Sequence, residues 1–158
     1  MLDAPREESL RTLEQAEETY GSAIAGLSAE QLDTPYRPDG WTVRQVIHHV
    51  ADSHAHAYCR LRFALTEEDP EIKPYNEKAW ADLIDARTED PQESLAIIGG
   101  LHRRWVRLLR NLKPEQWNRN FYHPERGAMS IEQQTALYAW HCRHHAAHIL
   151  GLRSRMNW

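Results

Sequence analysis

Cysteine, long apolar runs and excess positive charge are all scarce in this sequence. Its two cysteines, Cys59 and Cys142, are too few for a scaffold held together by disulfides. No run of about 18 uninterrupted apolar residues occurs, so the sequence predicts no membrane-spanning helix. Acidic residues outnumber basic ones, 23 against 19, and no long basic run occurs, which argues against nucleic acid as a partner. The first residues are acidic where a signal peptide is basic and then apolar, so we expect a cytoplasmic protein.

The rest of the composition is that of a globular protein with an unusual share of histidine. The 158 residues are 41% hydrophobic and 27% charged, which excludes a disordered chain and suffices for a sizeable core. No internal repeat or Gly/Ser-rich linker divides the sequence, so we expect one domain over residues 1–158. The 10 histidines are clustered, and this clustering holds most of the functional information.

Helical periodicity occurs in four long stretches, residues 7–27, 42–66, 91–112 and 130–155. Thr42 is a good N-cap for the second stretch, and Ser130 with Gln133 forms a capping box for the fourth. A short additional helix is expected from Asn76, and residues 118–127 read as a loop with room for a brief strand pair. The pattern predicts an all-α protein, a four-helix bundle with long loops between its helices.

Two groups of histidines lie on the second and fourth predicted helices. His141 and His145 are four residues apart, which places both imidazoles on one helix face at the spacing of two ligands to one metal ion. His144 and His148 repeat this spacing, so spacing alone does not decide between the pairs. One histidine of the second helix would complete a three-histidine site with an open fourth position, as in catalytic metal centres.

His49 is the favoured third ligand, because it lies beside Val50 near the apolar face, whereas His48 points about 100° away. Asp52 is a candidate for holding the outer N–H of a ligand or relaying a proton, and His144 is a second candidate for the relay. No glutamate follows His141, so the base of an H-E-x-x-H protease is missing.

Two further residues have simpler interpretations. The position of His102 on the apolar stripe of the third helix favours a buried neutral histidine over a metal ligand. Cys142 points away from the face of its neighbour His141, and we interpret it as a packing residue.

Several segments resemble the YfiT branch of the DinB superfamily. They are residues 32–54 (LDTPYRPDGWTVRQVIHHVADSH), 73–80 (KPYNEKAW), 121–124 (FYHP) and 138–149 (YAWHCRHHAAHI). The resemblance implies a four-helix bundle that holds one divalent metal ion per subunit, zinc or nickel, through His49, His141 and His145. It also implies a homodimer and an enzyme of a branch labelled as metal-dependent hydrolases, within a superfamily that includes thiol S-transferases.

The function we expect is conjugation of a low-molecular-weight thiol, of the bacillithiol kind, to an electrophilic small molecule. The first alternative is a hydrolase that activates water at the same site. The second is a metal-carrying bundle that binds ligands without catalysis. The expected partners are therefore a small thiol and an electrophile, with no nucleic acid and no membrane.

Overall fold

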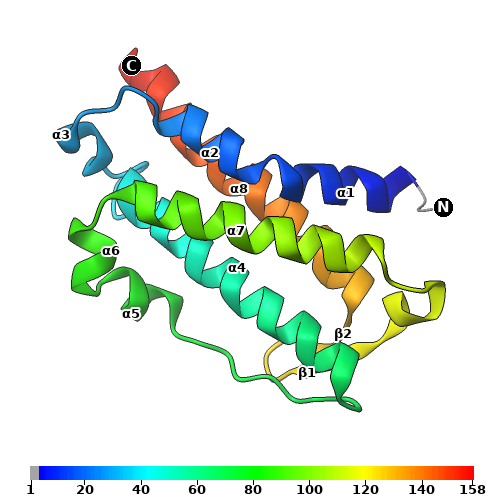
Figure 1. Cartoon of the computed structure of the whole chain (residues 1–158). Coiled ribbons are helices and arrows are strands. Elements are labelled where there is room, and N and C mark those ends of the chain that lie inside the picture. Colours follow the sequence, from blue (N-terminus) through cyan, green and yellow to red (C-terminus); the bar gives the residue numbers. More distant parts are fainter. Residues whose placement is uncertain (1–3) are drawn as a thin grey trace.

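The computed structural model describes residues 4–158, which form a bundle of four helical rods (Figure 1). Three rods are single long helices, and the first is a pair of helices that follow one another, α1 and α2. The rods are α1 (Ala4–Glu14) with α2 (Ala16–Ile24), α4 (Val43–Thr66), α7 (Pro91–Arg110) and α8 (Ile131–Met156). The connections hold the smaller elements α3 (Ala29–Leu32), α5 (Glu77–Ala81), α6 (Ile84–Thr88), the 3-10 helix η1 (Pro114–Asn118), and the strands β1 (Asn120–His123) and β2 (Gly127–Ser130).

The order of helix directions requires one long crossover. In Figure 1, α4 and α7 run in the same direction, while the α1–α2 rod and α8 run in the opposite one. The chain must therefore return along the length of α4 before α7 can begin, and residues 67–90 make this return. Helices α5 and α6 lie in the crossover and pack against α4. Bundles with a long crossover are a known variation on the simple up-and-down arrangement.

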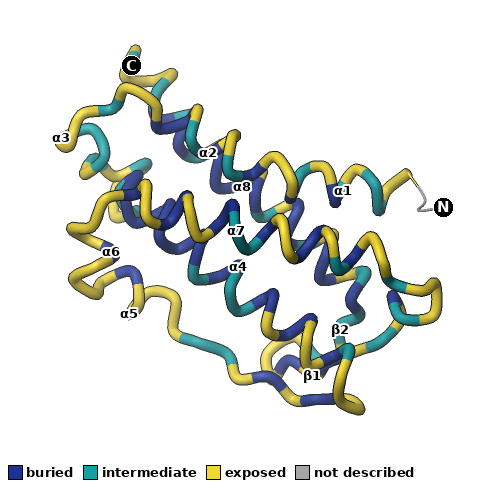
Figure 2. The backbone as a smooth tube through the Cα atoms, viewed as in Figure 1, coloured by how far each residue is buried: buried dark blue, intermediate teal, exposed yellow. Residues whose placement is uncertain are grey.

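The core lies where the apolar stripes of the four rods meet (Figure 2). Helix α4 packs against both α7 and α8, and the first rod packs against the same two helices. The stripes predicted from periodicity are buried or packed against the core, which confirms the predicted bundle. A buried hydrogen bond joins the first rod to α8, in which the Tyr20 hydroxyl donates to the carbonyl oxygen of Cys142 at 2.8 Å.

Side-chain caps fix where the long helices begin. The hydroxyls of Thr42 and Ser130 accept from backbone amides three residues on, and Gln45 and Gln133 return a bond to each cap backbone. These are the capping boxes expected of Thr and Ser followed by Gln. The cap predicted at Thr42 and the box at Ser130 are thus confirmed.

Two details differ from the sequence-based expectation. The helix predicted over residues 7–27 is divided at Gln15, and the Leu13 carbonyl next to the break accepts from Nδ1 of His102 at 2.7 Å. A side chain that enters the ladder of helical hydrogen bonds is a known cause of such a break. The helix expected from Asn76 is two short helices, separated by extended backbone at Leu83. The brief strand pair allowed for residues 118–127 is present: β1 follows η1 and pairs with β2 in an antiparallel hairpin, from Asn120–Ser130 to His123–Gly127.

Within the part of the chain that the structure describes, no helix is both long enough and apolar enough to cross a membrane.

Candidate metal centre

Three histidines from two helices converge at the interface of α4 and α8. His49 comes from the second turn of α4, and His141 and His145 come from the middle of α8. One ring nitrogen from each lies within 4.8 Å of the other two. Nε2 of His49 and Nε2 of His141 are 3.3 Å apart. The structure therefore brings together the three side chains that the sequence singled out as ligands.

Helix geometry and burial explain this convergence. A spacing of four residues places His141 and His145 one turn apart on the face of α8 that meets α4. His49 lies between the buried residues Ile47 and Val50, so packing of α4 turns it towards α8. The indole of Trp41 lies over His49, with ring centroids 4.6 Å apart, and covers that side of the cluster.

Burial keeps these imidazoles neutral, which is the form that binds metal ions. Desolvation lowers the pKa of His49 to about 4. Desolvation, followed by the proximity of other histidines, lowers the pKa of His141 to about 3 and that of His145 to about 2. At neutral pH all three rings can therefore offer a lone pair without first losing a proton.

One ring nitrogen in the cluster has no partner in the protein. Nδ1 of His145 is buried and makes no hydrogen bond to any described residue. A buried polar atom without a partner is costly and calls for an explanation. An unpartnered nitrogen beside two further neutral imidazoles fits a set of donors for one divalent metal ion.

The side chain of His48 points in a different direction from that of its neighbour His49. Its Nδ1 lies 2.7 Å from Oγ of Ser94, and its Nε2 lies 3.2 Å from the carbonyl oxygen of Glu89. Both ring nitrogens are thus occupied on the α7 side of α4, away from the cluster. The choice between His48 and His49, made from their positions on the helix, agrees with these contacts.

Two additional buried histidines connect the cluster to the first rod. Nε2 of His54 lies 3.1 Å from Nδ1 of His141, and Nδ1 of His54 lies 2.8 Å from Nε2 of His102. Burial lowers the pKa of His102 to about 4 and holds that of His54 well below its usual range. The expected buried neutral state of His102 agrees with this. The role of His54 was missed, because its five-residue distance from His49 matches no single-face helical spacing.

The two candidates for a proton relay lie at different places. Asp52 makes no hydrogen bond to any of the three ligands among the described residues, and burial, with Asp85 of α6 nearby, raises its pKa to about 6. His144 is closer, with its ring centroid 5.1 Å from that of His145. Its ring stacks on Trp140, and its Nε2 lies 3.1 Å from Nε2 of His148.

Neither cysteine belongs to the cluster of ligand atoms. Cys59 is exposed, and Cys142 is buried. Burial raises the pKa of the Cys142 thiol to about 12, so it stays protonated and unreactive at neutral pH. The interpretation of Cys142 as a packing residue agrees with this environment.

A pocket of about 330 Å³ lies beside the histidine cluster. It is lined by Tyr36, Arg37, Pro38, Ala147, His148 and Arg155. The ring of Tyr36 stacks on His148, and the His148 ring lies 5.6 Å from that of His145. Two arginines, Arg37 and Arg155, thus line a hollow close to the candidate metal centre, and both bond to Tyr36.

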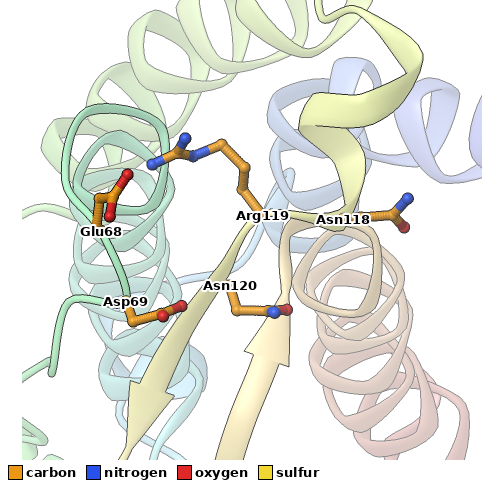
Figure 3. A pocket seen from close by; sticks show the side chains of 5 residues that line it. All are labelled: Glu68, Asp69, Asn118, Arg119 and Asn120. Atoms are coloured by element: carbon orange, nitrogen blue, oxygen red, sulfur yellow. The ribbon is translucent and has the colours of Figure 1, made fainter.

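A second pocket, of about 280 Å³, lies at the other end of α4 (Figure 3). It is lined by Glu68, Asp69, Asn118, Arg119 and Asn120. The 17 residues of α4 from Val50 to Thr66 correspond to about 25 Å of helix. This pocket is therefore too far away to hold a substrate of the histidine cluster.

Known proteins with similar sequences cover almost the whole chain. Residues 12–149 match the DinB superfamily. The chain is 49% identical over 150 residues to the Bacillus subtilis protein named "Putative metal-dependent hydrolase YfiT", a match that covers 94% of this chain and 84% of that protein. It is 51% identical over 152 residues to "Putative metal-dependent hydrolase OB0782" of Oceanobacillus iheyensis, covering 96% of this chain and 87% of that one.

Two solved structures share the fold. The structure of YfiT from Bacillus subtilis matches with a TM-score of 0.96 and 46% identity, over 100% of this chain and 91% of that chain. It is described as "a probable metal-dependent hydrolase with an unusual four-helix bundle topology". TT2238, "a four-helix bundle protein", matches with a TM-score of 0.61 and 20% identity, over 89% of this chain and 94% of that chain, and supports the fold alone.

Proposed function

Because this chain belongs to the DinB superfamily, we propose that it is a metal-dependent enzyme whose ligands are His49, His141 and His145. The observation that supports this most directly is the convergence of three neutral imidazoles on one point, one with a buried, unpartnered nitrogen. Three histidines leave further coordination positions open, as catalytic sites do. The ion we propose is zinc or nickel, one per subunit, since imidazole suits both.

The reaction we propose is thiol conjugation. A divalent ion held here would favour the thiolate form of a small thiol and orient its sulfur. The sulfur would then form a bond to an electrophilic carbon, the leaving group would depart with the bonding electron pair, and the thiol proton would go to a base. The products are a thioether and the protonated leaving group, so no oxidant or reductant is needed.

The residues around the centre suit this reaction. Trp41 packs against His49, with ring centroids 4.6 Å apart, and would shield one side of a bound ion from water. We favour Nε2 of His144 as the acceptor for the thiol proton, since its ring lies 5.1 Å from that of His145, whereas Asp52 makes no hydrogen bond to the three ligands among the described residues. Arg37 and Arg155 would hold an anionic group of the thiol in the neighbouring pocket, as expected for a thiol of the bacillithiol kind.

A hydrolase is the second candidate, and the names of the similar proteins favour it. In that reaction the same open position would activate water for attack on an ester or amide. A hydrolase needs a positioned group to move protons between water and the leaving group. No carboxylate belongs to the ligand cluster among residues 4–158, which makes this route the weaker proposal.

The experiment that separates these candidates measures both reactions on one metal-loaded preparation. We expect metal-dependent conjugation of monochlorobimane with bacillithiol or a comparable small thiol, and little turnover of an ester and amide panel. The His49→Ala variant should lose the activity, and the His48→Ala variant should keep it, because both ring nitrogens of His48 are occupied by Ser94 and the Glu89 carbonyl.

Metal-dependent ester or amide cleavage without thiol transfer would instead establish the hydrolase. Binding of thiols without turnover of either panel would identify a non-catalytic bundle.

A further inference from the structure

The two buried histidines behind the cluster form a continuous chain of ring contacts. It begins at the carbonyl oxygen of Leu13, 2.7 Å from Nδ1 of His102. It continues through Nε2 of His102 to Nδ1 of His54 at 2.8 Å, and from Nε2 of His54 to Nδ1 of His141 at 3.1 Å. The far nitrogen of His141, Nε2, is the one that faces His49 at 3.3 Å.

The Leu13 carbonyl at one end decides which nitrogen donates and which accepts in each hydrogen bond of this row. A carbonyl oxygen only accepts hydrogen bonds, so Nδ1 of His102 must hold a proton. A neutral imidazole has one N–H, so Nε2 of His102 is an acceptor and Nδ1 of His54 must donate to it. The same reasoning makes Nε2 of His54 an acceptor and Nδ1 of His141 a donor. The lone pair of His141 is then left on Nε2.

Neighbouring groups do not offer a stronger competing bond. The thiol of Cys142 also approaches Nε2 of His54, but at 4.0 Å it is farther than Nδ1 of His141. The rings of Trp105 and Tyr138 meet His54 edge to face, which leaves its two nitrogens to the other histidines. His54 and His102 are 0% and 2% exposed, so water does not replace the contacts.

We propose that His102 and His54 are positioning residues that fix the tautomer of His141, with the Leu13 carbonyl as their anchor. We call the hydrogen bonds that run from the Leu13 carbonyl through His102 and His54 to His141 the relay. The relay holds the proton of His141 on Nδ1 and leaves the Nε2 lone pair facing the proposed metal position. Metal-binding histidines in general give their second N–H to an acceptor that fixes tautomer and orientation. Here the acceptor is a second imidazole, oriented by a third. This inference deepens the proposed function and rests on the metal site described above.

The relay would act in the same way whichever reaction the metal centre performs. Its effect is on the free imidazole, because a ring with the proton on Nε2 would have to exchange it before binding an ion. Loss of an outer hydrogen-bond partner typically lowers metal affinity by about 10- to 100-fold. A variant that breaks the relay should therefore weaken metal binding without removing a ligand.

His102 offers a matched pair of substitutions. A glutamine can donate to Leu13 from its amide nitrogen and accept from His54 with its amide oxygen, so H102Q preserves the direction of the relay. A leucine can do neither, so H102L leaves Nδ1 of His54 without an acceptor. We expect H102L to bind zinc at least about 10-fold more weakly than the wild type, and H102Q to stay within about threefold.

The test measures zinc affinity by competition with a chelator, and the tautomer of His141 by long-range ¹H–¹⁵N NMR of the metal-free protein. The wild type and H102Q should have His141 protonated on Nδ1, and H102L should lose this preference. A wild-type His141 protonated on Nε2 overturns the proposal. So does an H102L protein whose affinity equals that of the wild type.

The two proposals can fail separately. If the wild type binds no zinc, the proposed function fails, and the NMR measurement still decides whether the relay exists. If H102L does not fold, the wild-type tautomer and its retention in H102Q decide the question. Zinc affinity and the His141 tautomer separate hydrogen bonding from packing, because H102Q and H102L both replace the same buried side chain but only H102Q keeps its hydrogen bonds.

Discussion

Histidine has several distinct environments in this molecule. His49, His141 and His145 share one point, His54 and His102 bond to one another behind it, and His48 bonds to the α7 side. Residues with the same side chain, some adjacent in sequence, thus have unrelated chemistry. What separates them is the direction of each side chain from its helix and the groups that it meets there.

The ligand assignment can be tested by substitution at single residues. His49→Ala and His145→Ala should each reduce bound metal from one equivalent to about a tenth or less, because two imidazoles do not make a stable site. His48→Ala is the matched control, since it removes a buried imidazole of the same helix that does not face the site. Elemental analysis of unsupplemented protein measures the metal. A full equivalent in either ligand variant would show the assignment to be wrong.

The three candidate ligands could be predicted from the sequence, whereas the contact between the two histidines behind them could not. A four-residue spacing selects His141 with His145, or His144 with His148, and the facing helix decides between them. His49 could be chosen because its neighbours are apolar. His54 and His102 could not be paired from the sequence, because their contact joins two helices whose relative rotation appears only after packing.

At the scale of helices, the paired glycines of α7 mark a close approach. A Cβ on Gly99 would overlap the carboxylate of Glu17 on α2, whereas a Cβ on Gly100 would meet no heavy atom of the described residues within 4 Å. Gly99 therefore allows α7 to pack closely against α2, whereas Gly100 faces open space.

The difference leads to opposite expectations for two alanine substitutions. Gly100→Ala should raise the free energy of unfolding by about 1 kcal/mol, because alanine has the higher helix propensity. That gain corresponds to an increase in Tm of about 2–4 °C for a protein of this size. Gly99→Ala should gain less or lose stability, since Glu17 must move away from its ion pair with Arg103. Thermal unfolding of both variants measures this, and equal gains would contradict the close contact.

The beginnings and ends of helices were predicted with unequal success. Caps at Thr42 and Ser130 are local, so the sequence contains all the information needed to place them. The break at Gln15 lies beside the Leu13 carbonyl, which is bonded to His102 of α7, and local periodicity contains no information about a contact so distant in sequence. The crossover that makes α4 and α7 parallel is likewise a property of packing that no single segment contains.

For the whole molecule, the buried histidines make stability depend on pH. His49 and His102 have pKa values lowered to about 4, and those of His141 and His145 are lower still, whereas unfolded histidine titrates near about 6.5. Below about pH 6.5 the unfolded chain therefore binds more protons than the folded one, and stability falls as pH falls. Asp52, with its raised pKa, acts in the opposite direction, but it is one group against four.

The metal-free protein should accordingly be less stable at pH 5.5 than at pH 7.5. Each histidine that stays neutral only in the folded state contributes a slope of up to about 1.4 kcal/mol per pH unit. Urea unfolding in the presence of a chelator measures the difference. Equal stability at the two pH values would show that these rings are protonated in the folded protein.

The division of the first rod has a consequence for how the protein could lose its proposed metal ion. That rod contributes no ligand, yet the carbonyl beside its break is the anchor of the relay proposed for His141. Opening of the amino-terminal segment away from α7, by proteolysis or by a competing binder, would remove the anchor of the relay without removing a ligand. If the proposed relay holds His141 in its metal-binding tautomer, local opening of a helix that supplies no ligand would speed the loss of a bound ion.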